Sequence, residues 1–252
     1  MTAVRRGTSL GIAMTTMTRR RAGRPVLALA LALGLVAIAG RADASTLLDY
    51  VTFDGIDYIR WAEEPGRVLT RGDLGPEFAT VECSFGDDLR RCPYGLDAAA
   101  AFLPTGTRMY AVRGHATNFR LAAVWNDRIF LYQAWRSARA KVGADLFDIA
   151  GKVRVVDVHR GELTRAVERR PVTIERSRDV EALVVMILRA PTRRPTPHAA
   201  GEPRYWLTLW LTDGTTLGRT FFVETSELMG GLVLPPEFRA VLEGYLGEEP
   251  PR

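Results

Sequence analysis

Residues 205–224 read YWLTLWLTDGTTLGRTFFVE, and this stretch predicts a β-hairpin. Two runs rich in aromatic and β-branched residues flank Asp213-Gly214, a dipeptide that favours the tight turn of a two-stranded ribbon. In the first run, Tyr205 and three leucines alternate with tryptophan and threonine, so one face is wholly apolar and the other is half-polar. The pattern predicts an antiparallel sheet whose apolar face lies against a core.

The half-polar face of this hairpin carries Trp206 and Trp210. At a rise of about 3.3 Å per residue their rings would lie roughly 13 Å apart, a spacing at which two flat rings stack on a saccharide chain or another extended ligand. The alternative is that a second layer covers this face and that the rings pack in the core. Trp206 and Trp210 are the candidate binding residues, and a cell-wall glycan or another envelope component is the candidate partner.

Two further hairpins are predicted upstream. The dipeptide DG at 54–55 lies between two β-rich runs at 50–61, and ND at 126–127 lies between FRLAAVW and RIFLYQAW at 119–135. Both faces of the last run are apolar, which is typical of a central strand. The N-terminal half of the exported chain is therefore expected to be β-rich.

Two stretches have the periodicity of helices. Between Ser177 and Pro191 apolar residues repeat at three- and four-residue steps, and a second pattern of this kind follows Pro235 and Pro236. We expect an α+β fold that consists mostly of antiparallel β hairpins, with two short helices in the C-terminal half.

The first 44 residues have the three parts of a secretory signal. Arginines at 19–24 precede an apolar run at 26–40, and ADA at 42–44 supplies a small-residue exit. A membrane span needs about 20 apolar residues, so this shorter run favours cleavage near Ala44 and a secreted or extracytoplasmic protein with no stable membrane span after cleavage. Tethering to the membrane by an uncleaved leader is the alternative. Three methionines are candidate starts: Met1, Met14 and Met17.

The positive charge of the chain belongs to this leader. The whole chain has 34 basic and 29 acidic residues, and residues 1–44 hold seven arginines and one aspartate. The remainder therefore has 27 basic and 28 acidic side chains, a net charge of −1. A basic isoelectric point alone gives no reason to expect nucleic acid as a partner once the leader is removed.

Cys83 and Cys92 are the only cysteines in the chain. In an oxidising exterior two cysteines this close are expected to form a disulfide. Their spacing matches neither a zinc knuckle nor a C-x-x-C redox motif, and no histidine lies near them in the sequence. The pair is therefore predicted to be structural.

The expected organisation is a signal peptide at 1–44, a β-rich half at 45–142, a β/α half at 143–247 and a frayed tail at 248–252. The two halves are either separate domains or one continuous domain. Together they exceed 200 residues, enough to bury a sizeable core.

The phrases FDGIDYI, DLGPEF, GTRMYAVRG followed by FRLAA, and GADLFDIAGKV resemble those of a group of exported bacterial proteins that have no assigned function. The resemblance covers about residues 50–156. It implies a shared exported fold, and it transfers no functional residues because the group has no assigned activity.

Known catalytic motifs are absent from the sequence. It contains no G-x-S-x-G, S-x-x-K, H-E-x-x-H, P-loop or dinucleotide-binding pattern, and no cofactor is expected. Asp145 and Asp148 are weak candidates for cation ligands, although Asp145 also suits a turn cap. We therefore expect a non-catalytic extracellular or cell-envelope binding protein; the alternative is a secreted hydrolase that uses a pair of carboxylates.

Overall fold

The structure is a computed structural model that describes residues 48–60, 65–87, 92, 95–161, 170–199 and 201–247. All of these residues belong to one compact unit that begins at Leu47. The expected leader, its cleavage site, the candidate starts and the expected tail at 248–252 lie outside the described residues.

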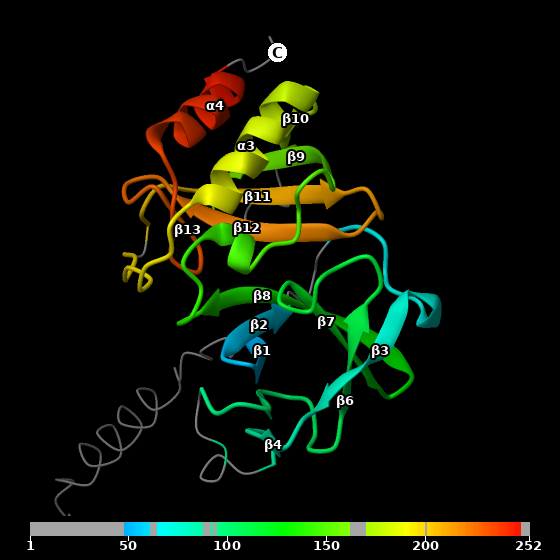
Figure 1. The fold of residues 1–252 in the computed structure, drawn as a ribbon. Coiled ribbons are helices and arrows are strands. Elements are labelled where there is room, and N and C mark those ends of the chain that lie inside the picture. Colours follow the sequence, from blue (N-terminus) through cyan, green and yellow to red (C-terminus); the bar gives the residue numbers. More distant parts are fainter. Residues whose placement is uncertain are drawn as a thin grey trace, which may run out of the picture. The chain divides into compact units, whose positions relative to one another are not determined.

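The first half of the described chain builds an eight-stranded sheet (Figure 1). Its strand order is β3-β6-β7-β8-β2-β1-β5-β4, and every neighbouring pair is antiparallel except β4 with β5. The strands are β1 (Asp49–Phe53), β2 (Ile56–Arg60), β3 (Leu74–Thr80), β4 (Cys83–Ser84), β5 (Ala99–Ala100), β6 (Arg108–Val112), β7 (Arg120–Trp125) and β8 (Arg128–Ser137).

This first sheet curls round on itself. Its two edge strands, β3 and β4, are consecutive in the chain and only residues 81–82 separate them. The Val81 N–H donates to the Thr107 carbonyl at 2.9 Å, and the Glu82 N–H donates to the Ala98 carbonyl at 2.8 Å. One bent segment thus provides both edge strands.

The predicted turns form as expected. Asn126 and Asp127, between β7 and β8, both have positive φ, as a two-residue hairpin turn of the favoured kind requires. Gly214, in the turn after β11, has a φ of 83°. The predicted disulfide is also present, because the sulfur atoms of Cys83 and Cys92 lie 1.98 Å apart.

The second half builds a six-stranded antiparallel sheet with the order β10-β9-β11-β12-β13-β14. The hairpin predicted at 205–224 forms its centre as β11 and β12. The strands are β9 (Val153–Arg160), β10 (Val172–Ile174), β11 (Arg204–Leu211), β12 (Thr216–Phe222), β13 (Glu227–Leu228) and β14 (Leu232–Val233).

Two helices, α3 (Ser177–Arg189) and α4 (Pro236–Gly247), lie on one side of the second sheet (Figure 1). The apolar stripe predicted for α3 is buried, as its repeat of apolar residues requires. Two short 3-10 helices, η1 (Arg71–Asp73) and η2 (Gly143–Asp145), complete the described elements. The fold is thus rich in antiparallel strands, with both α-helices in the C-terminal half. Within the described residues, no helix combines the length and the apolar composition that crossing a membrane requires.

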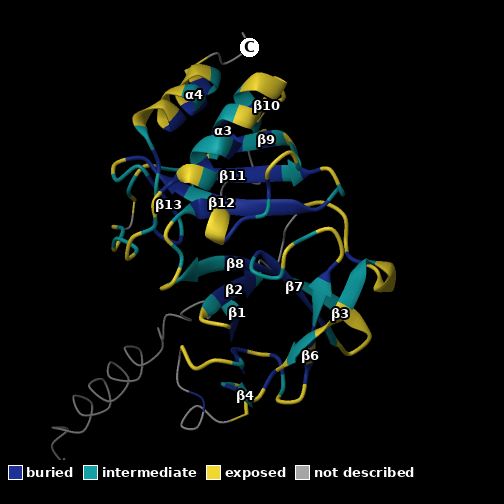
Figure 2. Cartoon of the chain, in the orientation of Figure 1, coloured by how far each residue is buried: buried dark blue, intermediate teal, exposed yellow. Residues whose placement is uncertain are grey.

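One hydrophobic core includes residues from both sheets, among them Tyr132 of β8 and Leu217 of β12, and it also contains Phe147 from the segment after η2. Figure 2 shows β11 and β12 as largely buried strands. Each sheet is drawn from one half of the chain, and this shared core joins the halves.

The sheets meet along the free edge of β12. This strand pairs with β13 only at Phe221 and Phe222, so residues 216–220 have no strand partner on that edge. Side chains replace the missing strand: Arg120 of β7 and Gln133 of β8 both donate to the Thr216 carbonyl, each at 2.6 Å. Backbone carbonyls that a missing strand would otherwise leave unpaired are thereby satisfied.

Further along this edge Arg219 donates to the Gly218 carbonyl and to the Ala134 carbonyl of β8. The Met229 N–H donates to the Thr220 carbonyl at 2.7 Å. Arg120 and Arg219 are both 0% exposed, so these contacts lie in a dry environment where a lost hydrogen bond is costly.

Candidate functional site

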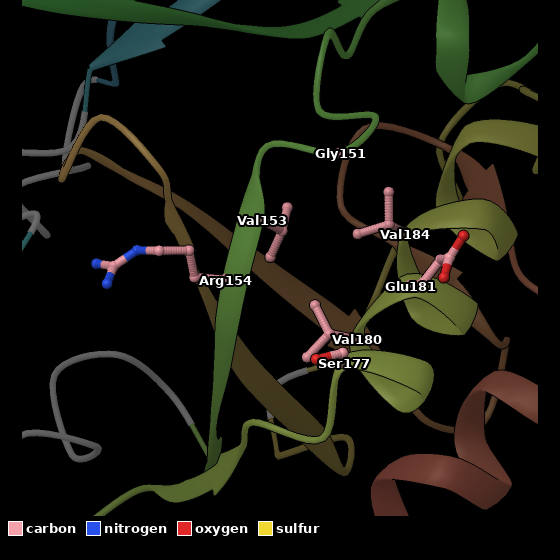
Figure 3. A pocket seen from close by; sticks show the side chains of 7 residues that line it. All are labelled: Gly151, Val153, Arg154, Ser177, Val180, Glu181 and Val184. Atoms are coloured by element: carbon pink, nitrogen blue, oxygen red, sulfur yellow. The ribbon is translucent and has the colours of Figure 1, made fainter.

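An open groove of about 540 Å³ lies between the first half of α3 and the start of β9 (Figure 3). Its floor is apolar because it is formed by Val180 and Val184 of α3 and Val153 of β9. Val180 and Val184 are buried and also belong to the core, so the floor is held in place by packing. The lining residues are Gly151, Val153, Arg154, Ser177, Val180, Glu181 and Val184.

Two exposed polar residues of α3, Ser177 and Glu181, form the rim. Among the described residues the Glu181 carboxylate has no hydrogen-bond or ion-pair partner. Arg154 also lines the groove, but its side chain points away from α3 and its Nε donates to the Leu211 carbonyl at 3.3 Å (Figure 3). The lining thus holds two opposite charges, Glu181 on α3 and Arg154 on β9, and neither has an ion-pair partner within the described chain.

The groove begins where β10 ends. On one edge β9 pairs with β11 from Val153 to Arg160. On the other edge it pairs with β10 only from Val156 to Val158, so residues 153–155 have no strand partner there within the described part of the chain. Such an edge presents backbone N–H and C=O groups to whatever lies beside it.

The lining of the groove has few groups that could act as a nucleophile. Its only hydroxyl side chain is that of Ser177, and no histidine or cysteine is among its lining residues. A serine nucleophile requires an adjacent base. What the groove does offer is an apolar floor, one free carboxylate and an open strand edge.

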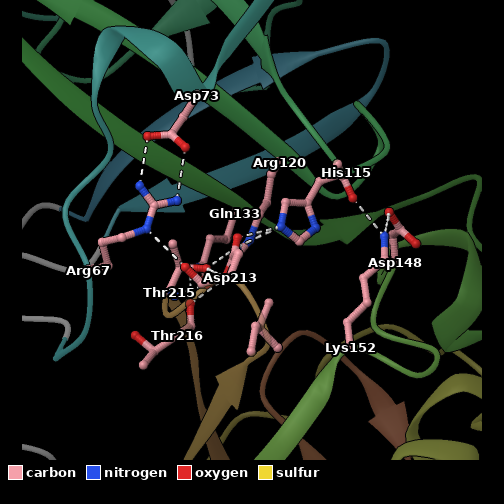
Figure 4. Close-up of polar contacts among 12 residues, drawn as sticks. Arg67, Asp73, His115, Arg120, Gln133, Asp148, Lys152, Asp213, Thr215 and Thr216 are labelled. Carbon is pink, nitrogen blue, oxygen red and sulfur yellow. Dashed lines mark hydrogen bonds and ion pairs between the residues drawn. The ribbon is translucent and has the colours of Figure 1, made fainter.

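A second polar cluster lies at the junction of the two sheets (Figure 4). His115 Nε2 lies 2.8 Å from Asp213 Oδ2, and Thr215 Oγ1 donates to Asp213 Oδ1 at 2.6 Å. Arg120 donates to Thr215 Oγ1 at 2.5 Å. These side chains come from segments almost 100 residues apart, and only the packing of the two sheets brings them together.

The contacts of His115 decide its tautomer. A carboxylate only accepts hydrogen bonds, so Nε2 carries the proton and donates it to Asp213. The Nδ1 lone pair is then buried and has no hydrogen-bond partner. Burial lowers the pKa of His115, and the nearby charges of Arg120 and Lys152 lower it further, although the bond to Asp213 acts in the opposite direction. His115 is thus held in its neutral form.

Asp213 is held in its charged form. Burial acts to raise the pKa of this carboxyl, but the hydrogen bonds from Thr215 and His115, with the charge of Arg120, bring it down to about 2. Arg67 adds a contact to the same residue, since its Nε donates to the Asp213 carbonyl at 2.9 Å. These hydrogen bonds therefore connect the turn after β11 to the first sheet and to the segment that contains Arg67.

This cluster resembles part of a catalytic site only in its residue types. The His115 side chain is 4% exposed and Thr215 is 1% exposed. A substrate therefore has no open approach to the unpaired nitrogen of His115. The arrangement suits the stabilisation of the junction between the two sheets.

The two candidate tryptophans lie in different environments. Trp206 is 3% exposed, and its Nε1 donates to Thr208 Oγ1 at 3.1 Å. Its indole lies against Gly218, where an added Cβ would come within 2.4 Å of the ring. Trp210 is half-buried and donates to Asp157 Oδ2 at 2.6 Å. The two rings therefore do not form an exposed strip, and ligand binding by this pair stays a prediction without support from ring exposure.

The two candidate cation ligands, Asp145 and Asp148, bond to different groups of the protein. Asp145 Oδ2 accepts the backbone N–H groups of Lys141 and Val142 at 2.7 and 3.1 Å, which lowers the pKa of the carboxyl. Asp148 Oδ2 accepts the Lys152 ammonium at 2.5 Å and the Ala116 N–H at 2.9 Å (Figure 4). Within the described residues no group of three or more His, Cys, Asp or Glu is arranged to hold a metal ion.

Comparison with known proteins finds no protein-family model, no curated protein and no solved structure that matches this chain. Functional conclusions therefore depend on the geometry of the two sites described above.

Sequence reasoning did not find either site. Val180 and Val184 were expected in the core stripe of a helix, and no local pattern indicates that one end of that stripe opens into a groove. No pattern around His115 in the sequence indicates a partner for it, and Asp213 was expected only in a turn. Their meeting has no sequence signal because it depends on which strand edges face each other.

Proposed function

We propose that this chain is an exported, non-catalytic binding protein of the bacterial cell exterior or envelope, and that it binds its ligand in the groove between α3 and β9. The observation that carries the proposal is the groove itself, in which an apolar floor, an unpaired carboxylate and an open strand edge adjoin one another. Pockets with a mostly apolar lining and a few convergent polar groups are typical ligand sites.

The Cys83–Cys92 disulfide supports the proposed location. Disulfides persist in oxidising compartments and are rare in cytosolic proteins. The leader at 1–44 agrees with this location on sequence grounds.

The hydrolase alternative finds less support. An enzyme that uses two carboxyls needs one of them protonated, with a raised pKa, to act as the general acid. In the described part of the chain, hydrogen bonds and nearby cations lower the pKa of four carboxyls: Asp73, Asp145, Asp148 and Asp213. Carboxylates held charged by structural hydrogen bonds suit stability better than acid catalysis.

The test is retention of the purified exported form on bacterial cell walls and on membrane vesicles. Ser177→Trp would fill the groove from an exposed position, so we expect it to fold normally and to lose at least tenfold in retention. Arg178→Trp is the matched control, since this neighbouring residue is exposed and does not line the groove. Circular dichroism melts would check that all three proteins fold alike.

Equal retention of wild type and Ser177→Trp would contradict the groove as the binding site. Steady release of soluble fragments from either envelope fraction by the wild-type protein would contradict the non-catalytic assignment.

A further inference from the structure

We infer that the groove takes an extended peptide segment, which pairs with the open edge of β9 as an added strand and places a basic side chain beside Glu181. The inference rests on the proposed function, because it names the ligand class of the same groove.

The backbone argument comes from β10. This strand ends at Ile174, opposite Val156, and the chain then turns into α3 at Ser177. Beside residues 153–155 the sheet therefore lacks the strand that a longer β10 would provide. A peptide that fills this place would hydrogen-bond through its main chain, as ligands do in other proteins that bind peptides by strand addition.

The other incomplete edge of the second sheet, along β12, is completed by protein groups. Along β12 the carbonyls of Thr216, Gly218 and Thr220 all accept hydrogen bonds from protein groups that stand in for the missing strand. At 153–155 no strand of the described chain stands in this place. The open edge of β9 is thus where the sheet has room for an external strand.

The side chains of the groove select the kind of peptide. Successive residues of a strand point to opposite faces, so alternate side chains of the peptide would contact the floor formed by Val153, Val180 and Val184. This favours an apolar residue at those positions. No lining residue has an aromatic ring, so the groove lacks the stacking surface that a saccharide chain would use.

Charge complementarity favours a basic peptide. Glu181 lines the groove, and its carboxylate is exposed and has no partner within the described chain. Arg154 supplies the only positive side chain in the lining, and it points away from α3. An arginine or lysine of the ligand would pair with Glu181 at the rim.

The first experiment uses fluorescence anisotropy with the labelled hexapeptide Val-Ser-Val-Ser-Arg-Ser, in which the two valines and the arginine share the face that would lie toward α3. We expect saturable binding to the wild-type protein, and at least tenfold weaker binding by one of two peptides that carry N-methyl groups on alternate amides. N-methylation removes main-chain donors and keeps every side chain, so it tests strand pairing directly. Equal binding by the unmodified and both methylated peptides would overturn the inference.

The second experiment exchanges charges. Glu181→Lys should weaken binding of the arginine peptide at least tenfold and should bind a glutamate-for-arginine peptide more tightly than wild type does. Glu237→Lys, at an exposed site on α4, is the matched control and should bind the arginine peptide as wild type does. A Glu181→Lys protein with unchanged preference would overturn the inference.

The outcomes separate the two proposals. Envelope retention that Ser177→Trp abolishes, together with no peptide binding, would overturn the peptide assignment and leave the binding function standing. Loss of neither retention nor peptide binding in Ser177→Trp would overturn both. A concentration-dependent dimer in light scattering that Ser177→Trp converts to monomer would also overturn the inference, because the occupant would then be a second copy of the chain.

Discussion

The second sheet has two incomplete edges, and they differ in whether their backbone groups have partners. Along β12 the buried side chains of Arg120, Gln133 and Arg219 donate to backbone carbonyls that have no strand partner. At β9, residues 153–155 face a groove, and the nearest lining carboxylate, Glu181, has no partner within the described chain. The first edge contains the residue types most often associated with catalysis, yet its bonding capacity is used in holding the sheets together. The second has a floor of three valines, and its backbone edge and carboxylate have no partner within the described chain.

At the candidate site, accessible backbone and carboxylate groups have no hydrogen-bond or ion-pair partner within the described chain. This property, more than the type of residue, distinguishes the site from the β12 junction. A ligand at the β12 junction would have to break existing buried hydrogen bonds, each of which is costly to lose. A ligand at the β9 groove would displace only water.

Arg120→Met should have the largest effect on stability. It removes a buried guanidinium and leaves the Thr215 hydroxyl and the Thr216 carbonyl with fewer donors, so we expect a loss of about 3–5 kcal/mol in the free energy of unfolding. Urea denaturation would measure it. Arg178→Met, at an exposed position on α3, is the control and should change stability by about 0.5 kcal/mol or less. A loss below about 1 kcal/mol for Arg120→Met would mean that the junction is not held as described.

Asp213→Asn should cost about 2 kcal/mol at neutral pH, because the pKa of this carboxyl falls from its usual value to about 2 on folding. A group with a lowered pKa in the folded state stabilises the protein above its unfolded pKa. The wild type should therefore lose this contribution as the pH falls from about 4 to about 2, and the variant should not. Denaturation at several pH values would show the difference, with the almost fully exposed Asp127→Asn as control.

His115→Gln should change the pH dependence at milder acidity. Because the pKa of His115 is lowered on folding, the unfolded chain takes up the proton first as the pH falls below about 6.5. Wild-type stability should then decline with a slope of at most about 1.4 kcal/mol per pH unit from this residue. Stability profiles between pH 7 and 5 should be flatter for His115→Gln, and parallel profiles would contradict the assignment of a neutral histidine.

Glu181→Gln should have the smallest effect on stability, about 0.5 kcal/mol or less, since the carboxylate is exposed and has no partner within the described chain. Its effect should appear only in binding of the arginine peptide, measured by anisotropy beside the Glu237→Gln control. A large loss of stability would show that the groove is held together by this carboxylate, as the β12 junction is by its polar groups.

Local signals were sufficient for the elements that local chemistry decides. The hairpin turns at 126–127 and 213–214, the helix that begins at Ser177 and the disulfide between Cys83 and Cys92 all form as predicted. In each case the determining residues lie within a few positions of one another, so backbone preference and short loop closure are sufficient.

The environment of the two tryptophans could not be predicted from local sequence patterns. Alternation placed Trp206 and Trp210 on a half-polar face, and that much is a local property of a strand. Whether the face is exposed depends on what packs against it, and the structure buries Trp206 against Gly218. Neither residue type nor spacing carries that information.

The amino-acid sequence is sufficient to predict the antiparallel hairpins, the two C-terminal helices, the disulfide and the loss of positive charge that would follow removal of residues 1–44. Which strand edges are completed and which stay open depends on the tertiary structure. Arg120 reaches Thr216, and His115 reaches Asp213, across almost 100 residues of sequence, and the groove exists because β10 ends beside Val156. Such contacts depend on how two sheets pack, and packing is a property of the whole chain.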